Sequence, residues 1–137
     1  MIRLIALFAA FAAPAAAQVT PISFESGKLL PLTPGQWSYS ATATGSEARY
    51  GAYFSMRCDR ATRTVTVSRP GAAPAILTIA TDMANRNLPA GGRLLANDPV
   101  LDAIAFSRGR FIVSGGGATL AIPSWPEAAR SIEDCRS

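Results

Sequence analysis

Histidine is absent from the 137-residue sequence, and this absence excludes several classes of enzyme. Ser-His-Asp and Cys-His catalysis both need an imidazole as general base. Zinc, copper and haem sites that rely on imidazole ligands are excluded for the same reason. The sequence also lacks the G-x-S-x-G motif of many hydrolases. We therefore expect a protein that is not an enzyme and that holds no metal or other cofactor.

Lysine and long apolar runs are scarce as well. Lys28 is the only lysine, and the residues around it lack the remaining positions of a phosphate-binding loop. The apolar run from Leu4 to Ala13 is shorter than the roughly 20 residues that a membrane-spanning helix needs. It follows Arg3 and precedes the small residues Ala15 to Ala17, which is typical of a secretory signal peptide.

These features predict a signal peptide over residues 1–17 and a single β-rich domain over residues 18–137. We expect this domain to lie in the periplasm and to have no membrane span after cleavage. Beyond residue 17 the sequence holds 12 basic and 9 acidic residues (13 minus Arg3, against 9), a net charge of +3. No dense basic stripe interleaved with aromatic residues occurs, so we expect no nucleic-acid partner.

Cysteine is limited to Cys58 and Cys135, which are 77 positions apart. Two cysteines in an exported chain most simply form one disulfide bond. A redox-active pair would have the C-x-x-C spacing, which is absent. A structural bridge across a loop of this length stabilises the fold by about 4 to 5 kcal/mol in the chain-entropy model.

Alternation of apolar and polar residues predicts strands in the first half of the domain. A short edge strand is expected at Ile22 to Phe24, and a turn at Gly45-Ser46. Four longer strands joined by short turns then form an antiparallel meander. Their expected ranges are 36–44, 48–58, 64–69 and 76–81, and Cys58 points into the core.

The second half mixes helices and strands. Residues 82–92 are predicted as a surface loop, either without a ligand or with binding residues at Asn85, Arg86 and Asn87. A short strand at Leu94 and Leu95 precedes a helix that begins at Asp98-Pro99. A hairpin follows, with strands 111–114 and 118–122. In total we expect an antiparallel β-sandwich or flattened barrel of seven or eight strands, with this short helix and a C-terminal helix.

The C-terminal helix is predicted from Ser124 to Cys135. Ser124 and Glu127 have the spacing of a capping box. Ala128, Ile132 and Cys135 recur on one helical face, which we expect to be buried. Trp125 shares this period and is predicted in the core, with an exposed anchor for a partner as the alternative.

The segment from Asp98 to Val113, followed by Leu120 to Glu127 and Ile132 to Cys135, resembles uncharacterised bacterial exported proteins. More distantly, its order of helix, strand, strand and closing helix is similar to the invasion-associated locus B family of periplasmic proteins. The resemblance to the exported proteins covers about 38 residues, from Asp98 to Cys135, and the more distant one is a similarity of arrangement alone. It implies a β-sandwich with peripheral helices and offers no catalytic residue.

Two groups of arginines are candidates for binding an anion or an acidic partner. They are Arg57, Arg60 and Arg63 around Cys58, and Arg108 with Arg110. The alternative is that they are turn charges, or that Arg108 and Arg110 pair with Asp102 or with carboxylates of the terminal helix. Carboxylates offer the remaining catalytic option, as acid and base pairs. The candidates are Asp98, Asp102, Glu127, Glu133 and Asp134, although helix capping and solvation explain them better.

We thus expect a non-catalytic binding or envelope-accessory protein of the periplasm, whose partner is an acidic protein or an envelope polymer. The alternatives are an inhibitor of a secreted enzyme, which requires a protruding rigid loop such as residues 82–92, or a small carboxylate-dependent hydrolase, which requires two close carboxylates in a concave site.

Cleavage is predicted after Ala17, because three small residues precede Gln18. The exported protein should therefore have an intact mass that corresponds to residues 18–137. Retention of residues 1–17 in that mass would contradict the prediction of a processed periplasmic domain.

Overall fold

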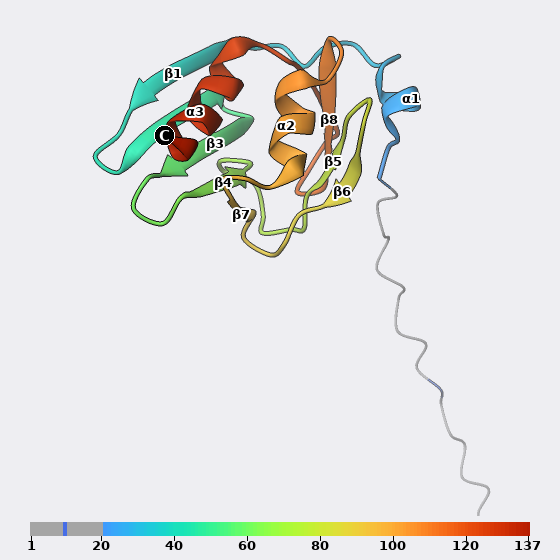
Figure 1. Cartoon of the computed structure of the whole chain (residues 1–137). Coiled ribbons are helices and arrows are strands. Elements are labelled where there is room, and N and C mark those ends of the chain that lie inside the picture. The colour runs from blue at the N-terminus through green and yellow to red at the C-terminus, as the bar shows by residue number, and fades with distance from the viewer. Residues whose placement is uncertain (1–9, 11–20) are drawn as a thin grey trace, which may run out of the picture.

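A computed structural model describes residue 10 and residues 21–137 of the chain. The predicted signal peptide and its cleavage site lie outside these residues, apart from Ala10. Two antiparallel sheets form the fold, one of five strands and one of four, together with a short helix and a C-terminal helix (Figure 1). The prediction of a mainly β sandwich with these two helices is confirmed, but the described residues form nine strands where seven or eight were expected.

The five-stranded sheet has the order β1-β2-β3-β4-β7. Its first four strands follow one another along the chain, so they form the expected meander. β7 then joins the sheet beside β4 after a long excursion through the other sheet. The strands are β1 (Trp37–Ala41), β2 (Gly45–Tyr50), β3 (Phe54–Asp59), β4 (Thr64–Ser68) and β7 (Arg93–Leu95).

The division between β2 and β3 differs from the prediction, which treated residues 48–58 as one strand. A turn at residues 51–53 separates the two strands, and Tyr50 pairs directly with Phe54. Gly51 adopts φ +53°, a conformation that suits glycine. The predicted turn at Gly45-Ser46 is also wrong, because the chain turns at residues 42–44 and Gly45 already belongs to β2.

The four-stranded sheet has the order β6-β5-β8-β9. Its strands are β5 (Thr78–Ala80), β6 (Asn85–Asn87), β8 (Arg110–Ser114) and β9 (Leu120–Pro123). β5 was expected to continue the meander but pairs with β8 in this second sheet. The segment 82–92 is not wholly a loop, because β6 lies within it and pairs with β5.

Three helices complete the fold: α1 (Phe24–Gly27), α2 (Pro99–Phe106) and α3 (Pro126–Arg136). The expected edge strand at Ile22 to Phe24 is wrong. Ser23 instead caps α1, since its Oγ accepts a hydrogen bond from the Ser26 N–H at 3.2 Å. Asp98 caps α2 as predicted, because its carboxylate accepts from the Val100 N–H at 2.9 Å.

The start of α3 lies one residue later than predicted. Trp125 is the N-cap residue, and no side chain caps the helix. Ser124 and Glu127 therefore do not form a capping box, since each is shifted by one position relative to the helix end. Trp125 has extended backbone angles and is 50% exposed, so its prediction as a core residue is wrong.

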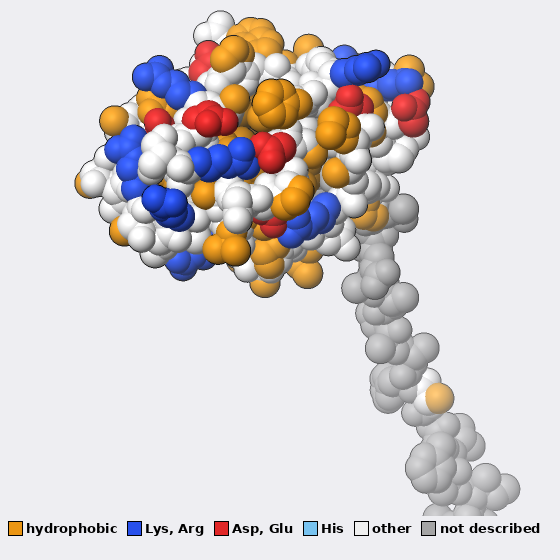
Figure 2. Space-filling model, in the orientation of Figure 1, with side chains coloured by type: hydrophobic (Ala, Val, Ile, Leu, Met, Phe, Trp, Pro, Cys, Tyr) orange, Lys and Arg blue, Asp and Glu red, His pale blue; other side chains and the backbone are white. Residues whose placement is uncertain are grey.

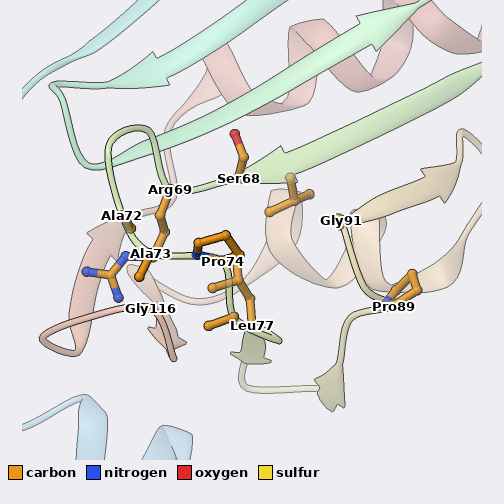
Figure 3. A pocket seen from close by; sticks show the side chains of 12 residues that line it. Ser68, Arg69, Ala72, Ala73, Pro74, Leu77, Pro89, Gly91 and Gly116 are labelled. Carbon is orange, nitrogen blue, oxygen red and sulfur yellow. The ribbon is translucent and has the colours of Figure 1, made fainter.

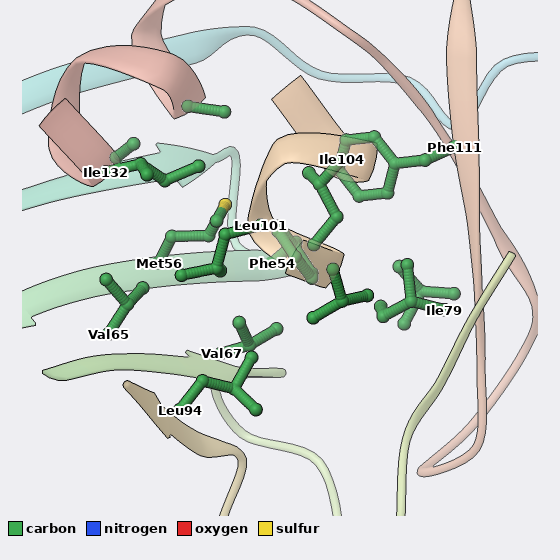
Figure 4. Packing of buried hydrophobic residues seen from close by; sticks show 14 of the residues in the cluster. Phe54, Met56, Val65, Val67, Ile79, Leu94, Leu101, Ile104, Phe111 and Ile132 are labelled. Atoms are coloured by element: carbon green, nitrogen blue, oxygen red, sulfur yellow. The ribbon is translucent and has the colours of Figure 1, made fainter. Parts of the chain in front are cut away.

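The main core fills the space between the inner faces of the two sheets and the helices α2 and α3 (Figure 4). Phe54, Met56 and Cys58 of β3 are completely buried in it, as predicted from their alternation. Leu101 and Ile104 of α2 contribute the helix side, and Phe111 approaches from β8. A second small cluster lies where α1 packs on the other side of the four-stranded sheet, around Ile112.

Cys58 and Cys135 form a disulfide, with their Cα atoms 5.5 Å apart. The predicted staple is therefore confirmed. It joins the central strand β3 to the last turn of α3, and both residues are buried in the main core.

Replacement of both cysteines by serine, Cys58→Ser with Cys135→Ser, should lower the free energy of unfolding by about 2 to 5 kcal/mol. The loss arises because the open chain gains conformational freedom when unfolded and because two hydroxyls enter the core. Denaturant unfolding of the double variant and of the native protein measures the difference. Equal stability of the two proteins would show that the bridge does not form in solution.

Candidate binding face

The five-stranded sheet has one apolar and one polar face. Residues such as Phe54 and Met56 point toward α2 and α3, so Ser55 and Arg57 between them point to the opposite side. Because directly paired residues share a face, the register identifies the rest of this side. We call it the outer sheet face and define it by Ser38, Ser40, Glu47, Arg49, Ser55, Arg57, Thr66, Ser68 and Arg93, with Asp59, Thr64 and Leu95 at its margin.

The strand register arranges the central side chains of this face in two rows. One row runs from β1 to β7 through Ser40, Glu47, Arg57, Thr66 and Arg93. The second row consists of Ser38, Arg49, Ser55 and Ser68. A shallow hollow of about 460 Å³ lies on this face and is lined mainly by residues of β2, β3 and β4. The surface therefore combines hydroxyl and guanidinium groups.

Three arginines share the outer sheet face with two carboxylates, those of Glu47 and Asp59. Arg57 contacts Glu47 at 3.1 Å and Arg49 contacts it at 3.5 Å. Glu47 is only 9% exposed, so its charge is largely shielded from solvent by these partners. Arg93 is exposed and forms no ion pair with any residue in 21–137. Asp59, at the end of β3, uses its carboxylate to accept from the Ala61 N–H at 3.0 Å.

The first predicted arginine group lies around the β3–β4 hairpin. Arg57 belongs to the outer sheet face, whereas Arg60 lies in the turn and contacts Asp134 of α3 at 3.6 Å. Arg63 is exposed in the same turn and lines a second hollow with Leu95, Asn97 and Arg136. The hairpin thus keeps the three residues near one another in the chain but directs them to different surroundings.

The second predicted group, Arg108 and Arg110, lies in the other sheet and its preceding turn. Arg108 contacts Asp82 at 3.7 Å, and Arg110 donates to the Leu30 carbonyl. The alternative in which these arginines pair with Asp102 or with the terminal helix is wrong. Arg136 pairs with Asp102 instead, at 2.8 Å, because the last turn of α3 lies next to α2.

Positive and negative side chains alternate on the side of the molecule that carries α2 and α3 (Figure 2). Three ion pairs on this side bring opposite charges together: Arg60 with Asp134, Arg86 with Asp98, and Arg136 with Asp102. Burial opposes ionisation of Asp98 and by itself would raise its pKa. Hydrogen bonds from Arg86 and from the Val100 N–H, together with the positive charge of Arg86, outweigh burial and hold the pKa of Asp98 below its usual value.

Asp134 connects α3 to the meander. The pKa of Asp134 is lowered mainly by the hydrogen bond from the Tyr39 hydroxyl. Burial opposes this effect. A hydrogen bond from Ser46 and the positive charges of Arg60 and Arg130 lower the pKa further. The guanidinium of Arg130 lies 3.9 Å from the centre of the Tyr39 ring. This network fixes the helix on the sheet.

The five carboxylates considered as acid and base pairs do not share a concave site. Asp98 and Asp102 are held by different arginines, and Asp134 is bound by Tyr39. One buried oxygen of Glu127 has no hydrogen-bond partner in residues 21–137. Of four hollows on the described surface, none is lined by any of these five residues.

An apolar slot lies between the end of β4 and the segment that leads into β5 (Figure 3). Its volume of about 170 Å³ is below the range of roughly 300 to 1,000 Å³ that is usual for ligand pockets. Pro74 and Leu77 line it, while the guanidinium of Arg69 lies toward Gly116. Arg69 donates to the Gly115 carbonyl at 2.6 Å, and burial lowers the pKa of Arg69. This arginine therefore serves to hold two loops together.

The remaining candidates are exposed structural residues. Asn85, Arg86 and Asn87 form β6; Asn87 accepts from the Thr78 hydroxyl at 2.7 Å, and Arg86 pairs with Asp98. Residues 21–137 contain no helix that is long and apolar enough to cross a membrane. They also contain no group of three or more Cys, Asp or Glu side chains placed to hold a metal ion.

Comparison with known proteins gave no match to a family model, to a curated protein or to a solved structure.

Sequence reasoning identified Arg57 but missed Arg49 and Arg93 as members of the same surface. The alternation in β2 and β3 already placed Arg49 and Arg57 on the polar side, so their common face was readable. The place of Arg93 on this face could not be predicted from the sequence, because β7 reaches β4 from a distant part of the chain. Only the paired register brings Arg93 opposite Thr66.

Asp98→Asn should lower the free energy of unfolding at pH 7 by about 1 kcal/mol, since asparagine still caps α2 but does not attract Arg86. The folded-state pKa of Asp98 lies below the unfolded value of about 3.9. The stabilisation is therefore fully present above about pH 4 and is lost as the pH falls through the folded-state pKa. Denaturant unfolding as a function of pH measures this difference.

The exposed Glu133→Gln is the matched control, with a change within about 0.5 kcal/mol. A stability difference for Asp98→Asn that persisted unchanged well below pH 4 would contradict the assigned role of the ion pair.

Proposed function

We propose that the protein is a non-catalytic periplasmic binding protein whose outer sheet face binds an anionic polymer of the cell envelope. The observation that carries this proposal is the charge of that face. It has three guanidinium groups against two carboxylates, of which Glu47 is shielded by Arg49 and Arg57 and Asp59, at the margin, accepts from the Ala61 N–H. The side with α2 and α3, by contrast, pairs three of its arginines with aspartates.

Arginine suits such a partner because its planar guanidinium binds carboxylate or phosphate oxygens through two parallel hydrogen bonds. The side chains of Arg49 and Arg57 are 43% and 60% exposed, so both keep donors available beyond their contacts with Glu47. The hydroxyls of the serines and of Thr66 add donors along the same rows. Individual exposed contacts contribute about 0 to 1 kcal/mol, and several acting together give useful affinity.

A polymer fits this surface better than an acidic protein. Protein interfaces usually have an apolar or aromatic centre surrounded by a polar rim. On the described outer sheet face the apolar side chains lie at the margin, at Pro70 beside the hollow and at Leu95 in β7. The centre is polar and provides no such anchor. A flexible polyanion needs no apolar anchor and can follow the two rows of polar side chains.

Two further features support a periplasmic location. The disulfide between Cys58 and Cys135 is of a kind that persists in oxidising compartments. Residues 1–17 have the composition of a signal peptide. The absence of histidine supports a role without turnover, because the commonest general base is missing.

The triple change Arg49→Ser, Arg57→Ser and Arg93→Ser should reduce affinity for a linear polyanion at least about tenfold, which corresponds to a loss of roughly 0.5 kcal/mol per arginine. Titration with alginate and with polyphosphate, which present carboxylate and phosphate oxygens, measures the effect and distinguishes the two chemistries. Binding by the native protein should weaken as added salt shortens the Debye length below about 8 Å.

The matched control removes the same number of positive charges elsewhere, through Arg60→Ser, Arg108→Ser and Arg130→Ser. It should retain most of the affinity if the outer sheet face is the site. Equal losses in the two triple variants would indicate attraction by net charge alone and would contradict the proposal. Tight binding of neutral dextran, or salt-insensitive capture of an acidic protein, would contradict it as well.

A further inference from the structure

We propose that the free edge of β1 pairs with β1 of a second copy of this chain, so that the protein forms a symmetric dimer through a continuous sheet. The proposal is independent of the ligand of the outer sheet face. It rests on how the four sheet edges of the described chain, β1, β7, β6 and β9, are treated.

The backbone groups that β1 directs outward can be identified from its turns. Thr42 and Gly45 exchange backbone hydrogen bonds, and the Gly51 N–H donates to the Gln36 carbonyl at 3.0 Å. Hydrogen-bonded pairs recur at every second residue of an antiparallel ladder, so the backbone N–H and C=O groups of Ser38 and Ser40 also point toward β2. The N–H and C=O groups of Trp37, Tyr39 and Ala41 therefore point away from the sheet. No residue in 21–137 forms a backbone hydrogen bond with them outside the sheet.

The other three edges are short or covered. β9 is covered, because the Thr33 N–H donates to the Ala121 carbonyl at 2.9 Å and the Ala121 N–H donates to the Thr33 hydroxyl at 3.0 Å. β6 and β7 have three residues each, and each carries an arginine, at Arg86 and Arg93. Short length and charge are common means of preventing unwanted strand pairing.

β1 has none of these protections. It contains five residues, Trp37–Ala41, without proline or a charged side chain, and its pairing with β2 runs without a bulge. Ser38, Ser40 and Ala41 are exposed, so the edge is accessible. Figure 1 shows β1 at the outer margin of the sheet. An open edge of this kind is a template for another strand.

The sequence of β1 suits pairing with itself. With Tyr39 opposite Tyr39 of the second copy, Trp37 lies opposite Ala41 and Ser38 opposite Ser40. Trp37 thus meets the small side chain of Ala41, Tyr39 meets its own counterpart, and no like charges face each other. All outward N–H and C=O groups of the three odd residues then find partners, because bonded pairs in an antiparallel ladder exchange both groups. This self-complementarity favours a second copy over an unrelated strand, because a two-fold axis requires that the same surface on both copies fit against itself.

Pairs of charges at Ser38 and Ser40 test the inference. Ser38→Lys with Ser40→Lys places like charges opposite each other across the proposed interface. Ser38→Glu with Ser40→Lys places opposite charges there, and within the chain these face Arg49 and Glu47 favourably. Sedimentation velocity from about 1 to 200 µM should show a dimer for the native protein and for the Glu/Lys variant, and a dissociation constant raised about tenfold or more for the Lys/Lys variant.

Ala41→Pro is an independent variant, because it removes an outward N–H while leaving the bonds between β1 and β2. It should also weaken the dimer, and thermal unfolding of each variant monitors the folded monomer. A native protein that is monomeric throughout the concentration range would overturn the proposal. This holds even if the edge of β1 instead receives a strand from another protein. Equal dimerisation of the Lys/Lys and Glu/Lys variants would overturn it too.

Discussion

Burial of Phe54, Met56 and Cys58 beneath α2 and α3 is the contact on which the other features of the molecule depend. It brings the last turn of α3 over β3, where the disulfide fixes it. Because successive strand residues point to opposite faces, the same contact directs Ser55 and Arg57 away from the core. The outer sheet face is thus a geometric consequence of the packing on the inner face. A one-residue shift of β3 would bury an arginine and expose the core.

Much of this arrangement could be predicted because it depends on local alternation. The buried side of β3, the helix that begins after Asp98 and the cysteine pair are all readable from spacing. The turn between β2 and β3 was missed for a specific reason. Tyr50 pairs with Phe54 across three residues, so even-numbered residues stay on one face before and after the turn. The period of two therefore continues without interruption, and only Gly51 marks the break.

The remaining errors concern contacts between distant segments. Trp125 matches the helical period of Ile132, but the helix begins after it, so the period does not apply to its side chain. Arg93 and Thr66 are brought together by pairing of β7 with β4, and β5 leaves the meander for the second sheet. Which strands pair after a long connection depends on the whole core. Local pattern therefore defines the faces of the strands, while the composition of the candidate site depends on their order in the sheets.

The disulfide also determines how the fold responds to mechanical tension. Cys135 lies two positions before Ser137, so a pull applied at Ser137 passes through the bridge directly to Cys58 in the centre of the five-stranded sheet. In the oxidised protein α3 cannot be peeled from the sheet one turn at a time. The force instead acts along the hydrogen-bonded β3, which has β2 and β4 on either side. In the reduced protein the same pull would detach α3 first, so the disulfide changes the order in which the helix and the sheet unfold under force.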